Sequence, residues 1–135
     1  MLWVDGGARG NPGPGGAGAV LRDGSGKKVA AMGWALGRRT NNDAEYEGLI
    51  RGLAMAASAG ARRLEVRSDS ELMVKQMNGE YRTKASHLRE AAGRARAALA
   101  PFEAVNFTAI PRGQNGEADR LANIAMDEEE KRRPD

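Results

Sequence analysis

The sequence predicts an α/β fold in which helices cover the faces of a β-sheet. Short, wholly apolar runs such as residues 2–4 are typical of strands that are buried on both faces. Between Tyr46 and Ala57, apolar residues recur at the i, i+3, i+4 spacing of one helical face. Strand and helix patterns follow one another in the order βββαβααβα along the 135 residues.

The first three strands are predicted within residues 1–36. Residues 2–4 run directly into Asp5, and the Gly- and Pro-rich stretch 6–16 predicts a loop. Strands over 17–23 and 28–36 follow, joined by the turn residues Asp-Gly-Ser-Gly. Strands this close in sequence, with so tight a turn, are expected to pair antiparallel.

The later elements are marked by caps and stop signals. The first helix is predicted to begin after the capping residues 40–42 and to end at Gly60. The remaining elements are predicted in order as a strand over 64–68, helices over 72–77 and 86–100, a strand over 102–110 and a last helix over 118–125. We expect one domain over residues 1–126, followed by a frayed, charged tail over 127–135.

Composition excludes several kinds of site. The chain has no cysteine and a single histidine, His87, which excludes thiolate zinc centres and cysteine nucleophiles and argues against a Ser-His-Asp triad. Any bound metal must then be a hard cation held by carboxylates. No apolar run approaches the ~18–20 residues of a membrane span, and the first residues lack a signal-peptide pattern. We therefore expect a soluble, cytoplasmic protein with no membrane partner.

Four acidic residues are poorly explained as solvated surface. Asp5 extends an apolar strand, and Asp69 stands at the carboxyl end of another, where open α/β sheets place their ligand sites. Glu45 borders the apolar face of the first helix, and Asp119 lies beside the apolar stripe of the last one. Each alone could cap a helix, pair with an arginine or be exposed. Together they describe a carboxylate cluster drawn from four separate elements.

Such a cluster is stable only if cations fill it or if some protons stay bound. Carboxylate oxygens without His or Cys suit Mg²⁺ or Mn²⁺. Two such ions about 4 Å apart would serve phosphodiester cleavage, since one orients and activates water and the other stabilises the leaving oxygen.

Other charged residues have surface explanations. Glu47 precedes Arg51 by one turn and is expected to form an i,i+4 ion pair on an exposed helix face. Arg94 and Arg96 are expected to solvate the Ala-rich helix rather than to line a nucleic-acid groove, and His87 to lie at a helix start or on the surface.

Four segments then carry a family resemblance: residues 5–16, 40–46, 68–70 and 115–122. In this order they resemble the signature segments of type 1 ribonucleases H, and the likeness covers nearly the whole chain. The resemblance implies a five-stranded mixed sheet, three strands antiparallel and then two parallel, with helices on both faces. It also implies that two Mg²⁺ ions, for which Mn²⁺ can substitute, are bound by Asp5, Glu45, Asp69 and Asp119.

The implied reaction is hydrolysis of the RNA strand of RNA/DNA hybrids, leaving 3′-hydroxyl and 5′-phosphate ends. The residues that match the family's substrate contacts are Asn11, Thr40, Asn41 and Asn42, with Thr40 and Asn11 on a DNA phosphate. Amide and hydroxyl groups can bind phosphates and 2′-hydroxyls without reading a base. Thr40 or an asparagine can instead cap the helix, a role compatible with binding.

Three positions depart from the best-known members of this family. Arg112 stands nearest the place of a loop histidine; it could contact the scissile phosphate or a product but cannot act as a base. A basic, Trp-bearing protrusion is reduced to residues 78–84, where Tyr81, Arg82 and Lys84 substitute only in part. We therefore expect weaker, more salt-sensitive hybrid binding. Glu71 replaces a substrate-contacting glutamine and is left out of the site.

Charge is divided unevenly between the body and the proposed site. The chain carries a formal charge of +3, residues 1–126 carry +5, and the same residues without the four carboxylates carry +9. A basic body around an acidic pocket suits an enzyme that attracts a polyanion. The sequence thus predicts a monomeric ribonuclease H. Two alternatives remain: a hybrid-binding module without useful catalysis, and a related DNA nuclease on the same scaffold.

Overall fold

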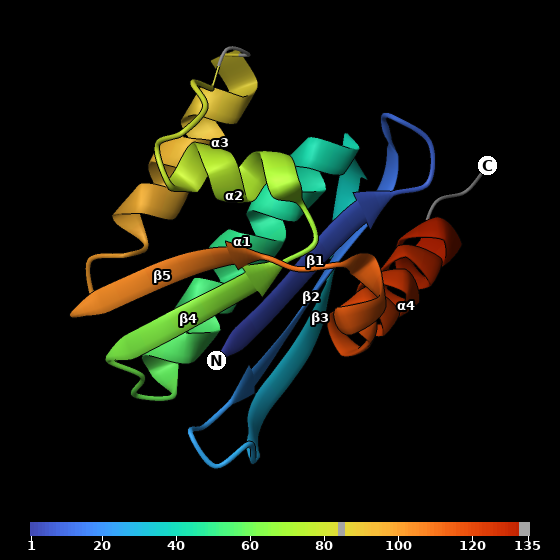
Figure 1. Ribbon diagram of the computed structural model, residues 1–135. Helices are drawn as coiled ribbons and strands as arrows, with labels where there is room; N and C mark the ends of the chain where they lie inside the picture. Colours follow the sequence, from blue (N-terminus) through green and yellow to red (C-terminus); the bar gives the residue numbers. More distant parts are fainter. Residues whose placement is uncertain (84–85, 133–135) are drawn as a thin grey trace.

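A five-stranded mixed sheet forms the centre of the computed structural model, which describes residues 1–83 and 86–132 (Figure 1). The strand order is β3-β2-β1-β4-β5; β1, β2 and β3 pair antiparallel, whereas β4 runs parallel to both β1 and β5. The strands are β1 (Leu2–Ala8), β2 (Gly13–Arg22), β3 (Lys28–Arg39), β4 (Arg63–Ser68) and β5 (Ala104–Ala109). The predicted fold class is confirmed.

Helices cover both faces of this sheet. Helix α4 lies on one face, against β1, β2 and β3, whereas α1 lies on the other, with α2 and α3 packed beside it (Figure 1). The helices are α1 (Asn41–Ser58), α2 (Glu71–Met77), α3 (Ser86–Ala97) and α4 (Gly116–Arg132), with a 3₁₀ turn over Arg112–Gln114. The largest apolar cluster joins fully buried side chains of β1 and α1, including Leu2, Val4, Leu49 and Leu53. Among the described helices, none has the length and apolar character needed to cross a bilayer.

The glycine-rich stretch 6–16 was wrongly predicted to be a loop. Strand β1 continues to Ala8 and β2 begins at Gly13, so only residues 9–12 connect them. The glycines serve close packing instead. A Cβ atom at Gly6 would lie 2.1 Å from the carbonyl oxygen of Ala44 in α1, and one at Gly16 would lie 2.6 Å from that of Ala122 in α4. Glycine here allows a helix backbone to approach the sheet on either face.

The chain after residue 126 is also not a frayed tail. Helix α4 continues to Arg132, and residues 133–135 of the expected tail lie outside the described residues. The added turns are held by contacts that are distant in sequence: Asp127 and Glu130 form ion pairs with Arg9, and Glu129 is buried. The charged composition indicated solvation, but these partners hold the helix end in place.

The surface explanation of Glu47 is wrong in part. Glu47 does pair with Arg51 at 3.3 Å, but its side chain is only 5% exposed and also accepts a 2.6 Å hydrogen bond from Arg94 of α3. Arg96 donates to the backbone oxygen of Gln76 at 2.9 Å. Both α3 arginines therefore attach α3 to its neighbours, rather than solvating an open face or lining a groove.

Candidate functional site

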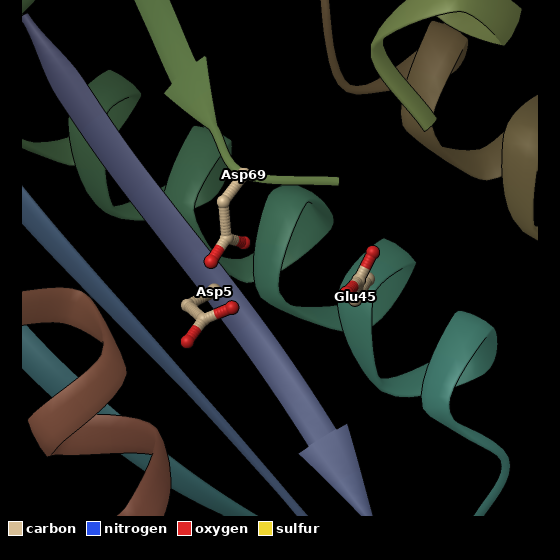
Figure 2. A group of neighbouring side chains, drawn as sticks. All are labelled: Asp5, Glu45 and Asp69. Atoms are coloured by element: carbon tan, nitrogen blue, oxygen red, sulfur yellow. The ribbon is translucent and has the colours of Figure 1, made fainter. Parts of the chain in front are cut away.

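Three of the four predicted carboxylates meet at the carboxyl end of β4, beside the middle of β1. Asp5 of β1, Glu45 of α1 and Asp69, which follows β4, each offer an oxygen within 4.8 Å of the other two (Figure 2). The strand pairing accounts for Asp5 and Asp69: Leu2 is level with Val66 and Trp3 with Arg67, and the same register puts Asp5 level with Asp69.

Close helix packing brings the other two carboxylates to Asp5. Gly48, one turn after Glu45, lies against β1 so closely that a Cβ atom there would be 2.5 Å from the backbone oxygen of Asp5. On the opposite face, Gly18 pairs with Asp5 in the sheet and lies against Ala118 in the first turn of α4. The next residue, Asp119, shares a hydrogen bond with the Asp5 side chain. Asp5, Glu45 and Asp119 line one open cavity of about 590 Å³.

The cluster is electrostatically strained in the absence of a cation. Burial raises the pKa of Asp5 to about 8, and the neighbouring carboxylates of Asp69 and Asp119 add to this effect. Burial likewise raises the pKa of Glu45 to about 7. The hydrogen bond from Ser70 favours the ionised form and acts in the opposite direction. A divalent cation would reverse this preference because its charge stabilises the carboxylates. The oxygen-only ligand set fits Mg²⁺ or Mn²⁺.

We expect the metal-free protein to lose stability as the pH rises from about 4 to about 8. Asp5 and Glu45 have folded-state pKa values above their ordinary ones, so the fold favours their protonated forms. Their contribution is fully present below the ordinary carboxyl pKa and is lost as pH passes the raised values. Denaturant unfolding in EDTA across this pH range measures the loss of stability. In Asp5→Asn the free energy of unfolding should fall less steeply with pH; an equally steep fall would mean that Asp5 does not cause it.

The predicted substrate-contact residues form a hydrogen-bonded junction beside the cavity. The backbone N–H of Asn41 donates to Asn11 Oδ1 at 3.0 Å, and that of Ala8 donates to Asn41 Oδ1 at 2.9 Å. Thr40 caps α1, since its hydroxyl oxygen accepts from the backbone N–H of Asp43 at 3.1 Å. Asn42 is exposed in the first turn of α1. The capping role foreseen for Thr40 is therefore present, and the junction joins the 9–12 connection to α1.

The loop before α4 places Arg112, not a histidine, at the cluster. Arg112 lines the cavity, its Nε lies 3.7 Å from Asp69 Oδ2, and its side chain is 89% exposed. His87 lies at the start of α3, as expected, with Nε2 3.7 Å from Asp43 Oδ1 and outside the residues that line the cavity. Of the reduced protrusion, Lys84 falls outside the described residues, and Tyr81 contacts Lys75.

Sequence reasoning missed several supporting residues. Ser70 caps α2 and also bonds Glu45, a role that its place after Asp69 could have suggested. Asn115 is fully buried and donates from Nδ2 to the backbone oxygen of Val4 at 2.9 Å, which ties the start of α4 to β1. Arg9 and Asn123 line the same cavity, but their mutual contact spans 114 residues and left no local signal.

Comparisons with known proteins agree with this geometry. Residues 3–125 match the family model described as reverse transcriptase-like. Ribonuclease HI of Halobacterium salinarum is 45% identical over 126 residues, which are 93% of this chain and 63% of that protein. The bifunctional protein Rv2228c of Mycobacterium tuberculosis is 47% identical over 94% of this chain and 35% of its own length. The chain thus spans less than two thirds of each of these relatives.

Solved structures show the same likeness. The crystal structure of RNase H1 from Halobacterium salinarum superposes with a TM-score of 0.91 at 45% identity, covering 94% of this chain and 96% of that one. LC11-RNase H1 in complex with an RNA/DNA hybrid gives a TM-score of 0.89 at 40% identity, over 94% and 96% of the two chains. The family resemblance in the four sequence segments is confirmed: this chain belongs to the reverse transcriptase-like family and, within it, to the type 1 ribonucleases H.

Proposed function

We propose that this protein is an endonuclease that hydrolyses the RNA strand of RNA/DNA hybrids with two divalent metal ions, leaving 3′-hydroxyl and 5′-phosphate ends. The observation that carries the proposal is the convergence of Asp5, Glu45 and Asp69 in one carboxylate group, with Asp119 hydrogen-bonded to Asp5. Asp5, Glu45 and Asp119 line the open cavity beside this group. It is supported by the 40% identical LC11-RNase H1, whose structure holds an RNA/DNA hybrid.

In this proposal, the four carboxylates hold two Mg²⁺ ions, for which Mn²⁺ can substitute. Bound there, the ions would activate a water molecule and stabilise the leaving oxygen. Asp5 has both Asp69 and Asp119 as neighbours, so its carboxylate would help to hold ions bound with either residue. Ser70 orients Glu45 through its hydrogen bond.

The junction beside the cavity is assigned to binding the nucleic-acid backbone. Asn11 and Asn41 use their Oδ1 atoms to hold the chain, and their Nδ2 groups have no hydrogen-bond partner within residues 1–83 and 86–132. These donors, with the exposed amide of Asn42 and the hydroxyl of Thr40, suit phosphate and 2′-hydroxyl oxygens. None of these contacts reads a base, as an enzyme that tolerates any sequence requires.

A panel of four labelled duplexes and strands tests the proposal. Hybrid, double-stranded DNA, double-stranded RNA and single-stranded RNA are incubated with Mg²⁺, Mn²⁺ or EDTA. We expect cleavage of the hybrid's RNA strand alone, in either metal and not in EDTA. Hybrid binding without cleavage in both metals would leave a binding module, and cutting of the DNA duplex would indicate a DNA nuclease.

The same enzyme is expected to be a cytoplasmic monomer, which sedimentation and cell fractionation can test.

Replacing Arg112 by Ala is expected to raise the KM for hybrid about tenfold, as for one lost charged contact. The Arg112 side chain is almost fully exposed beside Asp69, so it is free to turn toward a phosphate. The slope of log affinity against log salt should fall by about 1. The matched control is Arg63→Ala, at the far end of β4 with a 79% exposed side chain. Equal effects of the two variants would remove Arg112 from the binding site.

A further inference from the structure

The loop between β1 and β2 is attached to the last turns of α4 through one arginine. Arg9 Nη1 donates to Asp127 and, at 3.0 Å, to Glu130 Oε1. Its Nη2 donates to the backbone oxygen of Asn123 at 3.3 Å. The backbone N–H of Arg9 donates to Pro14 at 2.9 Å across the 9–12 connection. The guanidinium is therefore hydrogen-bonded to α4, although Arg9 is one of the residues that line the cavity of the carboxylate cluster.

A second contact from the same helix turn holds the end of β3. Glu129 is buried, and its Oε1 accepts a 2.7 Å hydrogen bond from the backbone N–H of Gly37. Gly37 has a φ of 75°, which glycine adopts without strain, at an irregular point of the strand. Three residues later the chain reaches Thr40, the cap of α1. The bond from Glu129 thus fixes the backbone just before a proposed substrate contact.

Both attached segments carry proposed substrate contacts, and they also touch each other. Asn11 lies in the connection that Arg9 holds, and Thr40 follows the strand end that Glu129 holds. Between them, the N–H of Asn41 donates to Asn11 Oδ1 at 3.0 Å. Asp127, Glu129 and Glu130, which we call the acidic turn, therefore support the junction from both sides.

We propose that the acidic turn is a positioning element for substrate binding: Asp127 and Glu130 hold the Asn11 connection through Arg9, and Glu129 holds the Thr40 segment through Gly37. The inference rests on the proposed function, because it assigns the junction to the nucleic acid. It also explains why a chain that binds a polyanion keeps these three acids beside its cavity. Their charge opposes the ligand, but their contacts order the groups that bind it.

The charge of the acidic turn and its hydrogen bonds should affect the KM for hybrid in opposite directions, so the direction of the change in KM distinguishes the two roles. If the acidic turn acts only through its negative charge, the protein without that charge should attract the hybrid more strongly, and the KM for hybrid should fall. If it positions the junction, removal should raise KM despite the more favourable charge. Asp127, Glu130 and Arg9 are all partly exposed, so solvent screens their ion pairs and a large change in global stability is not expected. We expect the substitutions to reduce local order at the junction instead.

The experiment compares Asp127→Ala/Glu130→Ala and Glu129→Ala with the control Glu128→Ala. Glu128 is exposed and lies in the same turn, so its replacement removes a charge without touching the junction. We expect the first two variants to raise the hybrid KM about tenfold, as for one lost contact, with kcat within about threefold. Glu129→Gln keeps an acceptor oxygen for Gly37 and should restore KM; Glu128→Ala should leave KM unchanged or lower it.

Amide hydrogen exchange supplies a readout that does not need activity. Exchange of the backbone N–H groups of Asn41 and Gly37 should accelerate in Asp127→Ala/Glu130→Ala and Glu129→Ala respectively, and not in Glu128→Ala. Unchanged exchange, or faster exchange with an unchanged or lower KM, would overturn the positioning role. Failure of the unaltered protein to bind or cleave hybrid would instead overturn the proposed function, and the exchange rates would still show whether the acidic turn orders the junction.

Discussion

Replacing Asp5 by Asn is expected to lower kcat for hybrid cleavage by at least about 1,000-fold, since metal-ion catalysis contributes several kcal/mol and each 1.4 kcal/mol is tenfold in rate. Asp5 lies near all three of the other carboxylates, because it groups with Glu45 and Asp69 and also shares a hydrogen bond with Asp119. Asparagine keeps the side-chain shape but offers a neutral oxygen. The loss should appear in single-turnover cleavage, whereas hybrid affinity in EDTA should stay the same.

Two further measurements make this prediction specific. Burial and the neighbouring carboxylates raise the pKa of Asp5 to about 8, so Asp5→Asn should make the metal-free protein more stable at high pH even as it abolishes cleavage. The matched control is Glu71→Gln, which removes a 71% exposed carboxylate two residues beyond Asp69. It should leave kcat nearly unchanged. A loss of kcat below about tenfold in Asp5→Asn would contradict a two-metal reaction centred on this residue.

Gly6→Ala is expected to destabilise the fold by about 3 kcal/mol or more, at the upper end for overpacking. A Cβ atom at Gly6 would lie 2.1 Å from the backbone oxygen of Ala44 and 2.7 Å from the backbone nitrogen of Glu45. Neither is the end of a flexible side chain, so α1 must shift away from β1. Chemical denaturation measures the loss, and the separation of Glu45 from Asp5 should also reduce cleavage in the folded fraction.

The control for this substitution is Gly93→Ala in α3. No heavy atom lies within 4 Å of a Cβ atom built there, and the residue is helical, so alanine should stabilise the protein by about 0.5–1 kcal/mol. A loss of stability in Gly6→Ala together with a gain in Gly93→Ala would show that close packing, rather than the loss of a glycine as such, determines the free-energy cost of the substitution. A stability loss below about 1 kcal/mol in Gly6→Ala would mean that α1 approaches the sheet less closely than described.

Local patterns were sufficient for the elements whose own residues show which of their faces are buried. The i, i+3, i+4 stripe of α1 and the apolar run that precedes Asp5 each depend on neighbours within a few residues, and both lie where expected. The stretch 6–16 was misread because glycine favours turns in isolation. Its role depends on α1 and α4, whose backbones come close only in the folded chain. The end of α4 was misread for the same reason, since its partner Arg9 is distant in sequence.

The candidate site was predictable where a residue's place in its own element is informative. Asp5 extends the apolar run of β1, Asp69 follows the carboxyl end of β4, and Glu45 borders the apolar face of α1. Glu47 shows the limit of this reasoning. Its spacing to Arg51 indicated an exposed pair, but Arg94, 47 residues away, makes it a buried ion-pair centre between α1 and α3. No periodicity within α1 carries that information.

In the proposed mechanism, the four carboxylates bind two metal ions at the substrate. A crystal of Asp119→Asn, chosen to slow cleavage, grown with RNA/DNA hybrid and Mn²⁺, tests it through the anomalous scattering of manganese. We expect two peaks about 4 Å apart, both in contact with Asp5 and with one phosphate of the RNA strand. Hybrid bound in the cavity without manganese at Asp5, or manganese bound only away from Asp5, Glu45 and Asp69, would contradict it.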